Sequence, residues 1–174
     1  MKGYLRCKTK FQIRRFKDGT AFEAGTPTPV IDGTGKRLRA VSTFRANLGL
    51  REGIEEAWKL IIGGTATAFN TSNAQTGVGE SSTAAADTDT DLLGSTKTYK
   101  AMDTSYPQIK GTGADAKVMV FKSTYGSSDA NNAWNEFIVR NGATGLKDLI
   151  RKVSAQGTKV SGQTWELTIE ITIA

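Results

Sequence analysis

Basic side chains gather near the N-terminus, in a pattern suited to binding an acidic partner. Residues 4–17 alternate polar and apolar, which predicts a β-strand, and the polar face of that strand is mostly basic. More basic residues follow a short turn. The candidate partner-binding residues are Arg6, Lys8, Lys10, Arg14, Arg15, Lys36, Arg37 and Arg39. Clusters of this kind can contact phosphates or an acidic protein surface.

Two simpler interpretations of this basic cluster remain open. It can be a solvated charged face, or an edge strand that its lysines and arginines protect from unwanted pairing. The net charge is +6, and the basic excess lies in the N-terminal third. Base reading would need aromatic side chains interleaved on the same face, and only Tyr4 is a candidate there. We therefore expect no sequence-specific nucleic-acid binding.

The residues most often used in catalysis are scarce. The chain has no histidine and a single cysteine, Cys7. This excludes histidine general bases, histidine zinc ligands, nucleophile–histidine dyads and an intrachain disulfide. Carboxylate pairs or lysines could still act, but we expect a protein that is not an enzyme and has no cofactor or metal.

Two short motifs resemble ligand sites only superficially. The glycines of 77–82 lack the third glycine of a dinucleotide fingerprint, so a strand with close backbone approach is the better interpretation. Asp87, Asp89 and Asp91 have the spacing of the first calcium-loop ligands. The glycine and distal glutamate of that loop are missing, which favours a solvated acidic loop over a cation site.

The predicted elements indicate a mainly β protein with one helix. Residues 164–174 alternate strictly, and strands are also predicted at 36–44, 97–102, 117–125, 134–140 and 149–155. Residues 144–152 could instead form a short helix. The apolar residues of 50–62 recur at helical spacing, and Gly63-Gly64 would end this amphipathic helix. We expect Trp58 to fill the core between helix and sheet.

The fold class is an antiparallel β-sandwich or open barrel. We divide the chain into an N-terminal basic strand and loop arm, residues 1–46, and a sandwich-like domain, residues 47–174. Residues 20–29 are expected to be an extended loop. Residues 65–96 are polar and would be a flexible loop unless a partner chain or packing along the sheet holds them. No apolar run is long enough to span a membrane, and the charged start does not fit a signal peptide.

The region from about residue 47 onward resembles structural proteins of tailed bacteriophages. The segments that carry the resemblance, besides the helix, are 69–74, 77–84, 100–107, 121–126, 129–137 and 151–159, the last leading into Trp165. The most telling are Asp129–Phe137 and Arg151–Lys159. Residues 1–46 match only loosely.

The resemblance implies a virion protein, and we favour a capsid decoration, or cement, protein. Its partners would then be the major capsid protein and further copies of itself, in a homo-trimer. It would be made in the host cytoplasm and lie on the capsid exterior, and no catalytic residues carry over. The alternative is a tail or fibre-associated protein that contacts the host surface.

Overall fold

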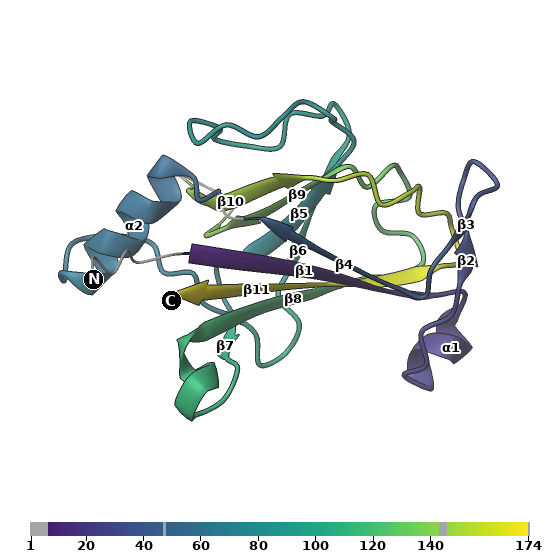
Figure 1. The fold of residues 1–174 in the computed structure, drawn as a ribbon, viewed down its shortest axis with the longest axis horizontal. Coiled ribbons are helices and arrows are strands. Elements are labelled where there is room, and N and C mark those ends of the chain that lie inside the picture. The colour runs from purple at the N-terminus through teal and green to yellow at the C-terminus, as the bar shows by residue number, and fades with distance from the viewer. Residues whose placement is uncertain (1–6, 47, 143–145, 174) are drawn as a thin grey trace, which may run out of the picture.

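Most strands of this chain form two antiparallel sheets that pack face to face as a β-sandwich, rather than a closed barrel (Figure 1). This architecture is that of a computed structural model, which describes residues 7–46, 48–142 and 146–173. The predicted mainly β fold with an antiparallel sandwich is confirmed.

The larger sheet has the strand order β4-β1-β11-β8-β7. Its strands are β1 (Cys7–Phe16), β4 (Val41–Ala46), β7 (Gln108–Ile109), β8 (Val118–Tyr125) and β11 (Thr164–Ile173). The first and last strands pair along their whole length, from Cys7 opposite Ile173 to Phe16 opposite Thr164. Figure 1 shows them side by side, in purple and yellow. The N-terminal strand therefore lies inside this sheet, between β4 and β11.

The smaller sheet has the strand order β10-β9-β5-β6. Its strands are β5 (Gln75–Gly79), β6 (Lys97–Ala101), β9 (Glu136–Arg140) and β10 (Asp148–Val153). Strand β5 is central, and a Cβ on Gly77 would lie 2.7 Å from side-chain atoms of both Ile138 and Tyr99. The glycines of 77–82 thus belong to a strand that neighbouring side chains approach closely, as the sequence indicated.

The remaining elements lie at the ends of the sandwich. They are α1 (Gly19–Glu23), the hairpin of β2 (Val30–Ile31) and β3 (Arg37–Leu38), α2 (Arg51–Ile61) and the 3-10 helix η1 (Gly113–Lys117). Figure 1 shows α2 at one end and the β2–β3 hairpin with α1 at the other. No helix in the described ranges has the length and apolar character needed to cross a lipid bilayer.

Alternating apolar residues of both sheets build the core. The period-two pattern of the last strand places Trp165, Leu167 and Ile169 inside, where each is fully buried. Trp134 packs edge-on against Trp165 with ring centroids 4.8 Å apart. Phe137 enters the same core from the smaller sheet. Each such side chain stabilises the fold by about 1.5–3 kcal/mol, so the core holds the surfaces described below in fixed positions.

Three of the predicted elements differ in detail. The expected loop at 20–29 begins with α1, which Asp18 caps by accepting a hydrogen bond from the Ala21 amide at 2.8 Å. The expected strand at 36–44 is divided into β3 and β4. The helix considered for 144–152 is wrong for 148–152, which lie in β10, while 144 and 145 lie outside the described residues.

Candidate partner-binding surfaces

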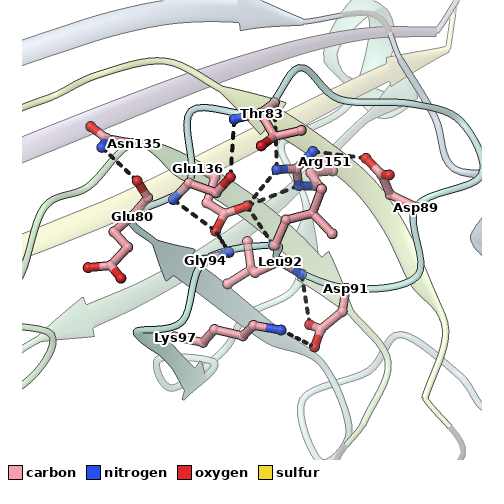
Figure 2. A network of polar contacts seen from close by, with 12 residues as sticks. Glu80, Thr83, Asp89, Asp91, Leu92, Gly94, Lys97, Asn135, Glu136 and Arg151 are labelled. Atoms are coloured by element: carbon pink, nitrogen blue, oxygen red, sulfur yellow. Dashed lines mark hydrogen bonds and ion pairs between the residues drawn. The ribbon is translucent and has the colours of Figure 1, made fainter.

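A buried ion pair fixes part of the polar 65–96 segment, which was expected to be held by a partner chain or by packing along the sheet. Glu136 and Arg151 are both fully buried on the outer side of the smaller sheet, with Nη2 of Arg151 2.7 Å from Oε2 of Glu136. Figure 2 shows the loop around Thr83–Gly94 wrapped about this pair. The Glu136 carboxylate accepts hydrogen bonds from the Gly94 amide at 2.7 Å and the Leu93 amide at 2.9 Å. The loop is thus held by the sheet of its own chain.

The three aspartates of this loop are used separately. Asp87 pairs with Arg51 at 2.8 Å, Asp89 with Arg151 at 2.8 Å, and Asp91 with Lys97 at 2.9 Å. Asp91 also accepts a hydrogen bond from the Tyr99 hydroxyl. The expectation of a solvated acidic loop is wrong for Asp89, which is largely buried against Arg151, whereas Asp87 and Asp91 remain partly exposed in ion pairs at the surface. Within the described ranges, no group of three or more acidic or cysteine side chains is arranged to hold a metal ion.

The predicted basic residues divide between the outer face of the larger sheet and a groove at the β2–β3 end of the sandwich. Lys10 and Arg14 point outward, directly across from Glu170 and Glu166 of β11. Their ion pairs measure 3.2 Å and 2.7 Å, and Lys110 and Lys122 contact the same two glutamates. Their charge is therefore shared with carboxylates of the same sheet. Lys8 is exposed, and Arg6 lies outside the described residues.

Four other predicted residues come together in a groove at the β2–β3 end of the sandwich. The groove has a volume of about 480 Å³ and is lined by Arg15, Lys36, Arg37 and Arg39, together with residues of the 133–135 and 155–158 segments. Lys36, Arg37 and Arg39 are exposed, and none forms an ion pair with another described residue. We call this feature the basic groove.

Arg15 is the buried member of the basic groove. It is 1% exposed, and its guanidinium lies 4.5 Å from the ring centroid of Trp165. It donates hydrogen bonds to the carbonyl oxygens of Arg39 and Gln156 and to the Ser42 hydroxyl. Its Nε has no hydrogen-bond partner among the residues that the structure describes. Burial lowers the pKa of Arg15 to about 10, so the side chain remains a cation at neutral pH.

One carboxylate, Asp32, also lines the basic groove and organises its rim. Oδ1 of Asp32 accepts hydrogen bonds from the amides of Thr34 and Lys36, both at 2.9 Å, and from the Thr34 hydroxyl at 2.7 Å. Burial acts to raise the pKa of Asp32, but these hydrogen bonds outweigh it and lower the pKa below its ordinary value. Asp32 is thus a turn residue, and the groove remains positive.

The helix α2 packs on the smaller sheet with its polar side. A Cβ on Gly53 would lie 2.4 Å from the Asp148 carbonyl oxygen, so glycine lets the helix approach β10 closely. Glu52 accepts a hydrogen bond from the Asp148 amide at 2.9 Å, and Glu56 accepts one from the Thr67 amide at 2.7 Å. Gly53 and Glu56 are the buried residues of this helix.

The apolar stripe of α2 therefore faces outward. Trp58 is 51% exposed, so its expected role as a core residue is wrong. Ile54, Ile61 and Ile62 are exposed as well, and Leu50 at the helix start is the member of the stripe that is buried. Ile54, Trp58 and Ile62 line a shallow hollow together with Arg51, Glu55 and Lys59. We call the surface of Ile54, Trp58, Ile61 and Ile62 the α2 apolar face.

Sequence reasoning missed the inverted packing of α2, although the sequence carried a signal. Gly53 and Glu56 are three residues apart and share one helix face, and glycine inside a helix usually has a packing reason.

The buried Lys159 was also not predicted as an internal residue. Its Nζ donates hydrogen bonds to the Gly126 carbonyl at 2.7 Å and to Oδ1 of Asn131 at 2.8 Å.

Comparison of this chain with protein-family models, curated proteins and solved structures finds no match.

Proposed function

We propose that this protein is a non-enzymatic structural protein of a phage particle that binds and stabilises the capsid shell. The observation that carries the proposal is the α2 apolar face. Ile61 and Ile62 are 70% and 79% exposed, beside a Trp58 that is half exposed. Contiguous exposed apolar surface of this kind marks protein interaction sites, since leaving it in water is unfavourable.

The rigid placement of α2 supports a role in holding a partner. Gly53 and Glu56 anchor the helix to β10 and to the 65–70 segment, so the α2 apolar face has a fixed orientation. A preformed surface binds with less loss of conformational entropy than a flexible one. The resemblance of residues 47–174 to tailed-phage structural proteins supports a capsid subunit as the partner, with the protein on the capsid exterior as a homo-trimer.

The test replaces Trp58 and Ile62 by serine and measures occupancy on the particle and its resistance to heating. Both side chains are exposed, so the variant W58S/I62S should fold normally. Burying a large apolar side chain is worth about 1.5–3 kcal/mol, so we expect at least about a tenfold loss of occupancy and an earlier shell transition. The matched control I31S/I109S removes exposed apolar side chains elsewhere and should bind normally.

Two outcomes would contradict the proposal. Unchanged occupancy of the W58S/I62S variant would remove the α2 apolar face from the contact. Density for the protein on the tail, and not on the capsid, in images of the intact particle would favour the tail or fibre alternative. In that case its removal would leave the thermal stability of the shell unchanged.

A further inference from the structure

The basic groove is lined by residues of the β2–β3 hairpin, which lies at the end of the sandwich opposite to α2 (Figure 1), and the α2 apolar face does not explain it. Four basic side chains line it, against the single carboxylate of Asp32. Asp32 accepts hydrogen bonds from the amides of Thr34, Lys36 and Thr158, and among the described residues it forms no ion pair with the basic residues around it. The groove therefore has an excess of positive charge that the described chain does not balance.

Arg15 shows that this charge is built into the fold. Desolvation penalises a buried guanidinium, and the usual compensation is a carboxylate. Arg15 instead has carbonyl, hydroxyl and aromatic partners, and its Nε is without one. A charge in such a low-dielectric setting acts more strongly on a nearby anion than an exposed charge does.

The residues that line the basic groove favour carboxylates over nucleic acid as its ligand. Its apolar residues are Leu38, Ala133 and Ala155, and no aromatic side chain of the described ranges lines it. Binding of single-stranded nucleic acid draws on aromatic rings on which bases stack. Carboxylates need only the charge and the planar fork of arginine. A volume of about 480 Å³ accommodates a few side chains.

We infer that the basic groove binds the side-chain carboxylates of an acidic peptide segment of a partner protein. Arg37 and Arg39 offer bidentate contacts at the rim, and Lys36 adds a third mobile charge. Arg15 supplies a fixed positive charge at the buried wall. This inference does not rest on the proposed capsid role, because it concerns a segment that the isolated protein can bind.

The test titrates the whole protein into a fluorescently labelled hexaglutamate peptide at low ionic strength and follows anisotropy. We expect saturable binding that weakens with added salt, because exposed charges are screened. The variant K36Q/R37Q/R39Q changes only exposed side chains and should fold. It should lose affinity about tenfold or more, because it removes three of the four positive charges of the groove and the planar donor groups of two arginines.

A matched control separates the groove from net charge. The variant K8Q/R45Q/K117Q removes the same number of exposed basic side chains elsewhere, and we expect its affinity to change less than about twofold. Amide resonances of Thr34, Lys36 and Thr158 should shift on titration with the peptide.

Three results would overturn the inference. Equal loss in the two variants would show binding to net charge alone. Absence of saturable binding by hexaglutamate would show that the groove is not a carboxylate site. Tighter binding of a hexathymidylate oligonucleotide, lost in the groove variant, would assign the groove to nucleic acid instead.

Discussion

Two arginines are buried to nearly the same extent in this protein, and they are compensated in opposite ways. Arg151 is 0% exposed and Arg15 is 1% exposed. Arg151 contacts the carboxylates of Glu136 and Asp89 and the Thr83 carbonyl. Arg15 contacts carbonyl oxygens, a hydroxyl and the Trp165 ring, without a carboxylate among the described residues.

The difference teaches how one residue type serves two purposes. The charge of Arg151 is neutralised within the chain, and the result is a rigid loop on the smaller sheet. The charge of Arg15 is stabilised by the dipoles of carbonyl and hydroxyl groups and by an aromatic ring. Because no carboxylate neutralises it, its positive electrostatic potential extends into the basic groove. A buried arginine that is paired with carboxylates thus holds neighbouring segments together. A buried arginine without a carboxylate partner leaves its positive charge available to a ligand.

The largest expected effect on stability comes from breaking the buried ion pair of Glu136 and Arg151. We expect Glu136→Gln to destabilise the protein by about 3–5 kcal/mol, because it removes the countercharge of a buried guanidinium. Equilibrium urea unfolding would measure the loss. Glu170→Gln, in a partly exposed pair with Lys10, is the control and should change stability by less than about 1 kcal/mol. Equal effects of the two changes would contradict the distinction drawn here.

A third arginine gives an intermediate case that pH can probe. Arg140 lies 3.3 Å from Asp148, which is fully buried and has an unpartnered Oδ2. Burial raises the pKa of Asp148 to about 7, and Arg140 only partly opposes the increase. The folded protein therefore binds a proton that the unfolded chain releases near pH 4, so this carboxyl makes stability fall as pH rises from about 4 to 7.

The Asp148→Asn variant isolates this effect. The free energy of unfolding of the variant, minus that of the unchanged protein, should increase between about pH 4 and pH 7 and then level off. Given a shift from 3.8 to about 7, the increase is at most about 4 kcal/mol. Unfolding curves at several pH values provide the measurement. A difference that stays constant with pH would show that Asp148 titrates normally.

The smallest of these effects on stability is expected for Arg15. Arg15→Met removes three hydrogen bonds whose acceptors belong to exposed or half-buried residues, so we expect a cost of about 1–3 kcal/mol. It leaves no buried charge without its partner, so the loss of stability should be smaller than that caused by Glu136→Gln. Urea unfolding of the two variants side by side makes the comparison. A larger loss for Arg15→Met would mean that its role is mainly structural.

Much of the fold could be predicted because it depends on local periodicity. The strict alternation of 164–174 predicted β11 and its buried side, and the helical spacing of 50–62 predicted α2 with its end at Gly63, whose φ is 75°. The strand at 36–44 was predicted as continuous, but it is divided, because β3 pairs with β2 whereas β4 pairs with β1 in the larger sheet. Nothing in the local pattern shows that Val30 lies opposite Leu38.

The candidate surfaces could be predicted only in part. The basic residues were recognised, but their division between the outer sheet face and the basic groove was not. Lys10 and Arg14 are neutralised because register places Glu170 and Glu166 directly across from them, more than 150 positions away in the chain. The outward position of Trp58 depends on the fit of Gly53 against β10.

The sequence by itself determined the types of element and the alternation of buried and exposed positions, because these follow from backbone geometry over a few residues. It also determined the chemistry available, since a chain without histidine and rich in lysine and arginine can bind anions but has few general bases. Only the tertiary structure decided which charges meet a countercharge and which apolar face stays exposed. Those outcomes depend on contacts between distant segments, and no local pattern encodes them.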